Sequence, residues 1–536
     1  MTQCNKTIIL LSKKISLALH VRKQKISRSL CLLLAIVPSG GCQPVPESSG
    51  APAYLVAAIE ADPAQFDPRY ATDANAVRIS KLLFSSLTRT DENSRIVLDL
   101  AERYEMKDPR TYWFRLRRGV YFHNGRAVSA GDVKYTYESV LDPKNQSPRR
   151  ASLQKLKSVE AKEPDEVTFR LHSPYAPFLE HASLGIVPAG TPGPAHTIIG
   201  SGPFALESFY PGDKAMLRAN PLYWQGRPQI PGIEIKIIPD AMTRLLEFKK
   251  GNVDFLQNDL EPDMLPWIQK QTRASVLVTP GTTFHYLGIN LEHPVLRRIE
   301  VRQALALAID HERIINHLLK GLAVPATGLL SPAHWAYEPA VKHWQYDPET
   351  AKRLLDKAGY PDPDGAGPLP RFKLSYKTST LDLRRRMAEV LKEELAQVGI
   401  ELEVRTFEWG TFYADVKKGN FHLYSLAWVG IADPDVYFNL FHSTSAPPNG
   451  DNRGRYRNGE IDALLEKARA TLDRRERAGL YGKVQRILAL ELPVIPLWWQ
   501  KNVVVMQPHV RGFVPYPDGD LESLTRVFLA SEPGQP

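Results

Sequence analysis

The sequence predicts an α/β protein with more than one lobe, and three observations lead to this fold class. The chain has 536 residues, and the part after its N-terminal leader is too long for one compact core. Short segments that alternate apolar and polar side chains predict half-buried strands, and longer segments with one apolar face predict helices. Because strands and helices alternate, we expect a largely parallel sheet.

The first half of the chain begins with strand patterns. Thr111–Leu116 and Glu166–Leu171 alternate apolar and polar side chains and are predicted to be strands. Between them, Ser129 followed three residues later by Asp132 is a capping-box variant, and it predicts a helix that runs to Val140.

The second half has longer and more regular helix patterns. The predicted helices here cover Val301–Ile309, Arg313–Leu319, the segment from Asp347 to Gly359, the face Met387–Val398 and the face Ile461–Leu472. The predicted strands are Ile233–Ile237 before this region and Arg371–Tyr376, Glu401–Arg405 and Pro493–Met506 within it.

The stretch from Tyr424 to Phe441 is the strongest candidate for a functional segment. It begins as a short apolar strand that carries Trp428 and breaks at Gly430. The turn that follows holds two acids, Asp433 and Asp435, on either side of a proline. Turn and cap requirements alone account for such acids. The alternative is a ligand-contacting segment held opposite a second lobe, which the organisation of the rest of the chain favours.

The first 41 residues have the pattern of a secretory signal peptide. They contain seven Lys or Arg and no Asp or Glu, followed by the apolar run Leu30–Val37 and then by small residues. That run is too short to remain as a membrane-spanning helix, and no other stretch reaches the required length of about 18 apolar residues. We therefore expect a soluble mature chain.

All three cysteines, Cys4, Cys31 and Cys42, lie at or before the end of this leader. We therefore expect no disulfide in the mature part. Cys42 follows small residues and resembles the cysteine of a bacterial lipobox, although Ser39 stands where that motif usually has Leu. We expect a lipid on Cys42 and a tether over residues 42–52. Ordinary cleavage nearby, without a lipid, is the alternative.

Net charge gives no argument for nucleic acid as a partner. The whole chain has 68 basic and 59 acidic side chains, a formal charge of +9. Without the seven basic residues of the leader, 61 basic side chains stand against 59 acidic ones, so the mature charge is +2. The high isoelectric point is mainly a property of the export signal.

Seven blocks of sequence resemble, in the same order, the family 5 extracellular solute-binding proteins, which are the peptide- and nickel-binding subunits of ABC importers. These blocks are Ala101–Glu138, Gly200–Gly212, Arg218–Pro228, Arg244–Phe255, Val301–Ile315, Tyr346–Tyr360 and Leu492–Val505. The resemblance covers essentially all of residues 53–530. It implies a two-lobed clamp of the periplasmic-binding-protein type (type II), with an extra subdomain in lobe I.

The resemblance also implies where the lobes begin and end. Lobe I would comprise residues 53–281 and 496–536 with an inserted subdomain at about 86–190, and lobe II would comprise 282–495. The chain would cross between the lobes near Gly281 and near Pro493. A hinge at these crossings needs only a few residues to change φ and ψ.

The implied function is capture of a peptide outside the cytoplasm and its delivery to an inner-membrane ABC permease. The expected location is the periplasm or another extracytoplasmic site, with a lipid anchor to the cell envelope, and the expected state is a monomer with no cofactor. Within the same family, a nickel chelate, haem or another small molecule is the alternative ligand. A secreted hydrolase is a more remote alternative.

The resemblance places ligand contacts at three positions: Thr72, Asp73 and Ala74; His285 and Tyr286; and Ala427, Trp428 and Val429. Backbone groups on extended segments can pair with a peptide as an added strand. Trp428 would offer a large rigid wall to a side-chain pocket. The alternative is that Trp428 and Tyr286 are core aromatics.

Recognition of the ligand's amine is the point at which this chain departs from the family pattern. In the peptide-binding members, an acid shortly after the tryptophan meets the α-ammonium, but Ile431 occupies that position here and the turn is one residue shorter. Asp433 or Asp435 takes over the role, with Asp433 favoured because Pro434 fixes the turn. Otherwise the ligand has no free amine and is N-blocked, a chelate or another solute.

The sequence contains no convincing catalytic or metal-binding constellation. His311, Glu312 and His317 have the wrong spacing for the zinc motif H-E-x-x-H, and we expect them to be surface groups. The sequence has no cysteine after position 42, so the mature part offers no cysteine nucleophile. Direct metal ligation would need converging side chains, whereas His285, His293, His422 and His442 are dispersed through the predicted lobe II.

Overall fold

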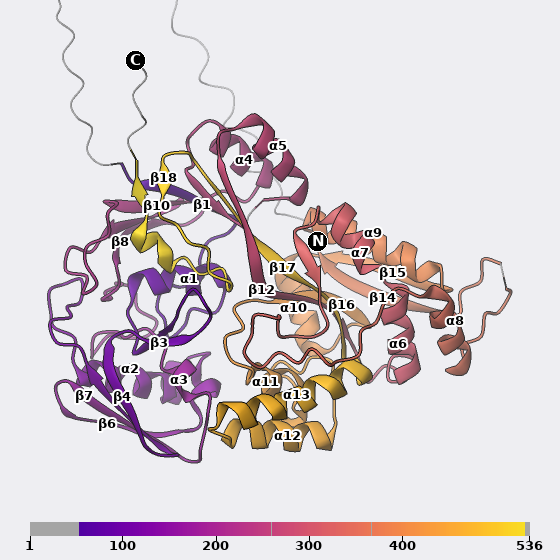
Figure 1. The fold of residues 1–536 in the computed structure, drawn as a ribbon, viewed down its shortest axis with the longest axis horizontal. Coiled ribbons are helices and arrows are strands. Elements are labelled where there is room, and N and C mark those ends of the chain that lie inside the picture. The colour runs from indigo at the N-terminus through magenta and orange to yellow at the C-terminus, as the bar shows by residue number, and fades with distance from the viewer. Residues whose placement is uncertain (1–52, 259, 366, 531–536) are drawn as a thin grey trace, which may run out of the picture. The chain divides into compact units, whose positions relative to one another are not determined.

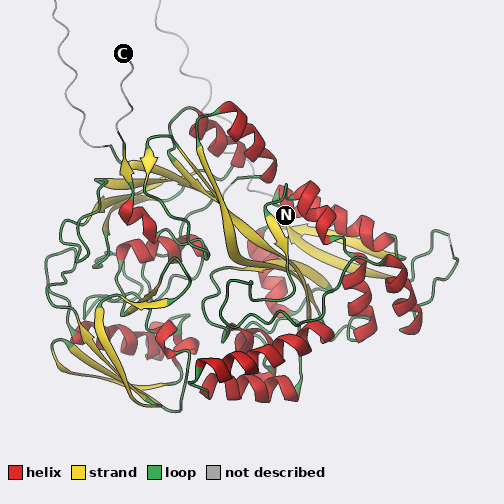
Figure 2. Cartoon of the chain, in the orientation of Figure 1, coloured by secondary structure: helices red, strands yellow, loops and turns green. Residues whose placement is uncertain are grey.

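The computed structural model describes residues 53–258, 260–365 and 367–530, which belong to one compact unit of the chain. Figure 1 shows this part by sequence position and Figure 2 shows its helices and strands. The predicted signal peptide, the tether and Cys42 lie outside the described residues. Within the described part, no helix is both long and apolar enough to cross a membrane.

One eleven-stranded sheet runs through the unit, in the order β15-β14-β16-β12-β17-β11-β1-β10-β9-β8, with β13 beside β17. The strands are β1 (Leu55–Ile59), β8 (Phe204–Tyr210), β9 (Lys214–Ala219), β10 (Gly232–Ile237), β11 (Phe255–Gln257), β12 (Ser275–Ile289), β13 (Ala323–Pro325), β14 (Phe372–Ser379), β15 (Ile400–Phe407), β16 (Leu423–Trp428) and β17 (Val494–Met506). We call the part around β1 and β8–β11 lobe I, and the part around β14–β16 lobe II.

The sheet is mixed, so the prediction of a largely parallel sheet is wrong. Strand β1 pairs in parallel with β10 and β11, and β14 does so with β15 and β16. The other pairings are antiparallel. Helical crossovers give parallel pairs within each lobe. The long strands β12 and β17 run in opposite directions through the middle of the sheet, which makes the neighbouring pairings antiparallel.

Strands β12 and β17 continue from lobe I into lobe II. Ser275–Thr279 pairs with Asn502–Met506, and Thr283–Gly288 pairs with Val494–Gln500. The register shifts between Thr279 and Thr283, on either side of Gly281. A Cβ at Gly281 would lie 2.3 Å from the Gln500 carbonyl oxygen, so only glycine fits this close approach.

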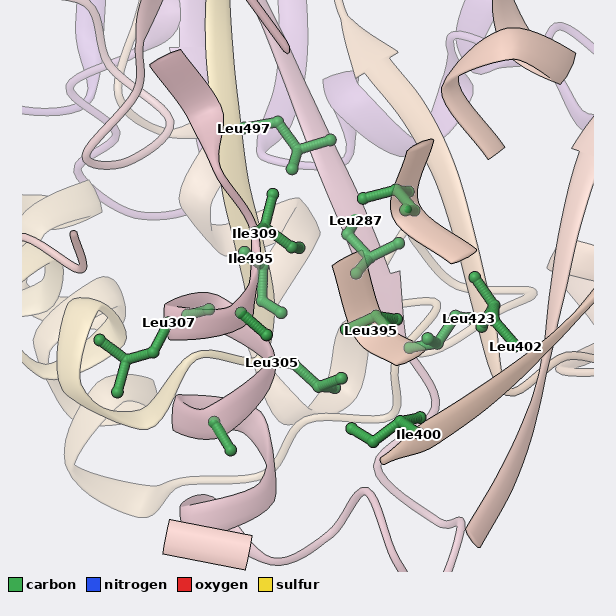
Figure 3. Close-up of a cluster of buried hydrophobic side chains, with 14 of the residues drawn as sticks. Leu287, Leu305, Leu307, Ile309, Leu395, Ile400, Leu402, Leu423, Ile495 and Leu497 are labelled. Atoms are coloured by element: carbon green, nitrogen blue, oxygen red, sulfur yellow. The ribbon is translucent and has the colours of Figure 1, made fainter. Parts of the chain in front are cut away.

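Helices cover both faces of the sheet in lobe II. On one face, α6 (Ile299–Ala308), α8 (Pro348–Lys357) and α9 (Asp382–Ala396) enclose a core with Leu287, Leu423 and Ile495 (Figure 3). The other face is covered by α10 (Trp409–Lys418), α11 (Val436–Phe441), α12 (Gly459–Ala470) and α13 (Arg474–Glu491). Most of the sheet in lobe II is thus covered on both faces, whereas the edge strand β15 alternates buried and exposed side chains.

Lobe I carries helices and a separate small sheet. Its helices are α1 (Ala74–Leu83), α2 (Ala130–Leu141), α3 (Phe178–His181), α4 (Ala241–Lys249) and α5 (Leu265–Gln271). The small sheet has the order β4-β5-β7-β6, with β4 (Ala101–Asp108), β5 (Thr111–Leu116), β6 (Leu156–Glu163) and β7 (Glu166–Leu171), and it shares a core with α2. Two-stranded pairs, β2 (Thr88–Thr90) with β3 (Ile96–Leu98) and β18 (Val510–Arg511) with β19 (Phe528–Leu529), complete the lobe.

Local sequence signals located most elements correctly. Strands β5 and β7 have the predicted bounds, and Ser129 and Asp132 form the predicted capping box of α2. The predicted helix Arg313–Leu319 is wrong, because α7 (His311–Arg313) ends there and Ile314–Leu318 forms a π-helical turn. The Leu319 amide donates to the Ile314 carbonyl at 3.1 Å, which widens the turn by one residue.

Candidate ligand-binding site

Strands β12 and β16 bring two of the three predicted contact positions together. His285 lies opposite Ala427 and Tyr286 opposite Leu426, while Phe284 lies opposite Trp428. Strand β14 pairs with β16 only at Leu423 and Tyr424. Beyond Tyr424, strand β16 therefore has no ladder partner on the β14 side among the described residues. Open carboxyl ends of parallel strands are where α/β sheets commonly bind ligands.

Trp428 is half-buried in a layered group of aromatic and basic side chains. The Arg453 guanidinium lies 4.9 Å from the centre of the Trp428 ring, within the range of a cation–π contact. Arg453 also donates to the Tyr286 hydroxyl at 3.1 Å and to Asp451 at 2.8 Å. Tyr286 is only 3% exposed, so its side chain is a core aromatic. Val429, next to Trp428, is 44% exposed.

His285 is a buried histidine whose two ring nitrogens are both occupied. Its Nε2 pairs with the Gln500 side-chain oxygen at 2.8 Å, and its Nδ1 accepts from Arg384 at 3.3 Å. Burial, followed by the charge of Arg384, lowers the pKa of His285 to about 3. The ring is therefore neutral, and both of its nitrogens have partners within the protein.

Asp433 forms a buried ion pair with Arg477. Arg477 Nη2 donates to Asp433 Oδ1 at 2.5 Å and Nη1 donates to Oδ2 at 2.7 Å. Both side chains are 6% exposed. Because a guanidinium occupies both carboxylate oxygens, an arriving ammonium would have to displace it or share them.

Asp435 connects lobe II to the segment of lobe I that precedes α3. It pairs with Arg469 Nε at 2.9 Å and accepts from the Tyr175 hydroxyl at 3.0 Å. The Ala176 amide donates to the Arg469 carbonyl at 2.8 Å beside it. Burial raises the pKa of Asp435. Ile431, which stands at the family's acid position, is 7% exposed and packs in the lobe II core.

Thr72, Asp73 and Ala74, which we call the first loop, have different environments. Asp73 is the N-cap of α1, because its carboxylate accepts from the Ala76 amide at 2.8 Å and the Ala64 amide at 3.1 Å. Thr72 and Ala74, on either side of it, are exposed. The first loop is therefore held in place by Asp73 and leaves its two neighbours accessible.

A cavity of about 260 Å³ in lobe I contains polar residues that the sequence did not single out. Its lining includes Lys81 of α1, Phe84 directly after that helix, Arg149, and Glu180 and His181 of α3. Burial lowers the pKa of His181 to about 4, and its Nε2 pairs with the Tyr175 hydroxyl at 2.8 Å. These residues come from segments far apart in the chain, so no local pattern indicated them.

The dispersed histidines do not converge. The rings of His293 and His422 are tilted by 43° with their centres 4.2 Å apart, whereas His442 lies beside Phe438 and Glu466. Among the described residues, no group of three or more His, Cys, Asp or Glu is arranged to hold a metal ion. His311 is half-buried and pairs with the Pro496 carbonyl at 3.0 Å, so its prediction as a surface group is wrong.

Known proteins with similar sequences and folds cover most of the chain. The family model described as bacterial extracellular solute-binding proteins, family 5 Middle, matches residues 95–449. The oligopeptide-binding protein AppA of Bacillus subtilis (strain 168) is 29% identical over 500 residues, which are 89% of this chain and 91% of AppA.

Two solved structures extend this similarity to the fold. AppA in complex with a nonapeptide has a TM-score of 0.80 and 28% identity, and the match covers 90% of this chain and 100% of AppA. NikZ from Campylobacter jejuni in complex with Ni(L-His) has a TM-score of 0.79 and 28% identity, and covers 88% and 99% of the two chains.

These matches confirm the predicted α/β clamp of two lobes. The matched family and these relatives are described as solute-binding proteins. The sequence blocks between Ala101 and Val505 therefore identified the right relatives, and the chain belongs to the bacterial extracellular solute-binding proteins of family 5.

Proposed function

We propose that this protein is the extracytoplasmic substrate-binding component of an ABC importer and that it captures peptides between its two lobes. The observation that carries the proposal is the similarity, over 90% of the chain, to a solved oligopeptide-binding protein that holds a nonapeptide. The protein would hand its ligand to an inner-membrane permease and would catalyse no reaction itself.

The open side of β16 supports a strand-like mode of peptide binding. A peptide laid beside Ala427 and Trp428 would form main-chain hydrogen bonds that do not depend on its side chains. Trp428 and the exposed Val429 would contact its side chains from lobe II, and Thr72 and Ala74 would do so from lobe I. His285 and Tyr286 would hold β16 in place through the pairing of β12 with β16, and they would not touch the ligand.

We keep the predicted lobe boundaries as part of this proposal. Lobe I would comprise residues 53–281 and 496–536, with the subdomain near 86–190, and lobe II would comprise 282–495. The register shift supports the crossing near Gly281. Because Val494–Gln500 pairs with Thr283–Gly288 of lobe II, the second crossing would lie near Gln500 and Asn502 instead of near Pro493. Anchoring through a lipid on Cys42 and a monomeric state are further parts of the proposal. Replacing Cys42 with Ala should release the protein from the membrane fraction.

A non-peptide ligand is the second candidate, and one observation favours it. Asp433 and Asp435 both have arginine partners, so the turn after Trp428 offers no uncommitted acid for an α-ammonium. NikZ, with bound Ni(L-His), represents the same fold with a chelate ligand.

Mass spectrometry of the solute that co-purifies with the protein separates the two candidates. A set of short peptides in that fraction, together with a higher melting temperature when the same synthetic peptides are added, would support the first. A dialysed protein that melts at the same temperature with every peptide, and carries a metal chelate or a tetrapyrrole, would contradict it.

A further inference from the structure

The two lobes touch where the segment before α3 meets lobe II. The Tyr175 hydroxyl donates to Asp435 at 3.0 Å and accepts from Arg469 at 3.4 Å. Beside it, the Ala176 amide donates to the Arg469 carbonyl at 2.8 Å. Tyr175 is only 2% exposed, so water is largely excluded from this contact. Because the partners belong to different lobes, these hydrogen bonds are made in the closed clamp and are lost when the lobes separate.

Three acids but only two paired cations gather around this contact. In lobe II, Asp433 pairs with Arg477 at 2.5 Å. Asp435 pairs with Arg469 at 2.9 Å. The third acid is Glu180 of lobe I, and its carboxylate forms no hydrogen bond or ion pair with any residue that the structure describes. With Glu180 ionised, the closed contact therefore contains one uncompensated negative charge.

Tyr175 holds Glu180 close to the acids of lobe II. The Tyr175 hydroxyl lies 2.8 Å from His181 Nε2, and the two rings stack with their centres 5.5 Å apart. Glu180 directly precedes His181 in α3, and Asp435 lies on the other side of the same hydroxyl. Closure therefore brings the Glu180 carboxylate towards Asp433 and Asp435, and opening takes it away from them.

The charged or titratable groups that face Glu180 from the elements around it, besides Tyr175 and Arg469, are Lys81, Arg149, His181, Asp433, Asp435 and Arg477. Lys81 is already in direct contact with Asp520. Arg149 donates to the Ala71 carbonyl at 2.7 Å. Burial lowers the pKa of His181 to about 4, so this ring is neutral at and above about pH 5.5. A proton is therefore the species that can neutralise the third acid of the closed contact.

We infer that closure of the two lobes takes up a proton on Glu180, so that acid favours the closed clamp and rising pH opens it. The inference goes beyond the proposed function, because it concerns the closing movement and is independent of which solute is bound. An acidic medium would thus favour retention of a captured solute, and a more alkaline medium would favour its release.

The direction of this pH dependence follows from the surroundings of Glu180 in the two states. In the open clamp the carboxyl group faces water, where the usual pKa is about 4.3. In the closed clamp, burial and then the charges of Asp433 and Asp435 raise its pKa well above that value. Above about pH 4.3, each pH unit therefore lowers the ratio of closed to open protein by up to about tenfold, until the raised pKa is reached. Asp435 keeps Arg469 in both states, because both belong to lobe II.

Hydrogen exchange at the Ala176 amide measures closure without any ligand. This amide bonds across the lobes, so its protection, divided by the intrinsic exchange rate at each pH, reports the closed population. In the unliganded full chain, protection should fall at least about tenfold between about pH 5.5 and pH 7.5. Glu180→Gln should keep high protection at both pH values, because the amide side chain carries no charge.

Two controls separate closure from local unfolding and from general charge effects. The Ala182 amide donates to the Phe178 carbonyl at 3.0 Å within lobe I, so its protection should not follow that of Ala176. Glu105→Gln removes an exposed acid of β4 in the same lobe and should reproduce the wild-type pH dependence.

Each contrary outcome bears on this inference alone. Equal protection of Ala176 at both pH values in the wild-type protein would overturn proton-linked closure, whether the clamp stays closed or stays open. The same pH-dependent fall in Glu180→Gln would overturn the assignment to Glu180. Neither result would affect the proposed capture of peptides, which the co-purifying solute decides.

Discussion

At the residue scale, Asp433 is a candidate ligand-binding residue in the sequence, but in the structure its carboxylate is paired with Arg477. Replacing Asp433 with Asn would leave the buried Arg477 guanidinium without its counter-charge. We expect this to lower the free energy of unfolding by about 3–5 kcal/mol, the usual cost of breaking a buried pair from one side. Urea denaturation of the two proteins measures the difference.

A double variant gives the control for Asp433. Combining Asp433→Asn with Arg477→Met removes the uncompensated charge and should recover part of the lost stability. The sequence-based prediction that Asp433 binds the ligand's amine leads to a different expected result for Asp433→Asn. If Asp433→Asn keeps wild-type stability and loses only its preference for free-amine peptides, then Asp433 is the amine acceptor and the structural role is wrong.

The burial of Glu394 leads us to expect that the stability of the protein depends on pH. This glutamate of α9 is 1% exposed and accepts one hydrogen bond, from the Asp310 amide at 3.2 Å. Burial raises its pKa to about 7. The folded state thus holds this proton more tightly than the unfolded chain, where the pKa is about 4.3. The resulting stabilisation is complete below that value and is lost as pH rises through about 7.

Glu394→Gln should remove the pH-dependent stabilisation that comes from the buried Glu394 carboxyl group. Between pH 4.5 and pH 8, wild-type protein should lose about 3 kcal/mol more stability than the variant, by denaturant unfolding at each pH. Glu389→Gln, which changes a 66% exposed residue on the same helix, is the control and should follow the wild-type curve. Parallel curves for wild type and Glu394→Gln would contradict the buried-proton explanation.

At the element scale, α1 shows a local structural role for a residue that is also predicted to contact the ligand. Asp73 caps this helix, so Asp73→Ala should cost about 1 kcal/mol of stability while Asp73→Asn should keep most of it. Thermal unfolding of the three proteins measures the difference. Loss of peptide affinity in Asp73→Asn, with stability unchanged, would show that the carboxylate itself contacts the ligand.

Elements whose formation depends on local signals were predicted well, and those that depend on partners were not. Strand β7 and helix α2 follow from alternation and from the Ser129–Asp132 cap, both of which are readable over a few residues. The direction of the pairing around β12 and β17 was missed, because an apolar strand pattern records burial and contains no information about which strand lies beside it.

At the scale of the whole molecule, contacts between the lobes predict how closure is stabilised. Tyr175 donates to Asp435 across the lobes, and Arg386 of α9 pairs with Glu261 at 2.9 Å and with Asp263 at 2.7 Å. A ligand that touches both lobes should favour the same closed state by its differential affinity. Solution scattering should therefore give a smaller radius of gyration with bound peptide.

Tyr175→Phe tests this coupling without altering the size of the side chain. Removal of the hydroxyl takes two interlobe hydrogen bonds from the closed state, the one donated to Asp435 and the one accepted from Arg469, so peptide affinity should fall by about threefold to tenfold. Tyr210→Phe, at a residue 56% exposed on β8, is a matched control. Identical scattering curves with and without saturating peptide would contradict closure. An unchanged peptide affinity in Tyr175→Phe would show that the Tyr175 hydroxyl does not stabilise the closed state.

The sequence by itself determined the family, the α/β class and the places of most helices and strands. These properties depend on periodicity, caps and ordered blocks of residues, all of which are local or collinear. The sequence also predicts that the segment around Trp428 contacts the ligand. Tertiary structure alone decided what the polar side chains there do. Arg477 meets Asp433 across 44 positions and Tyr175 meets Asp435 across 260, while Glu180 has no oppositely charged partner among the described residues. Which charge stays unpaired depends on which distant groups pack together, and no local pattern records that.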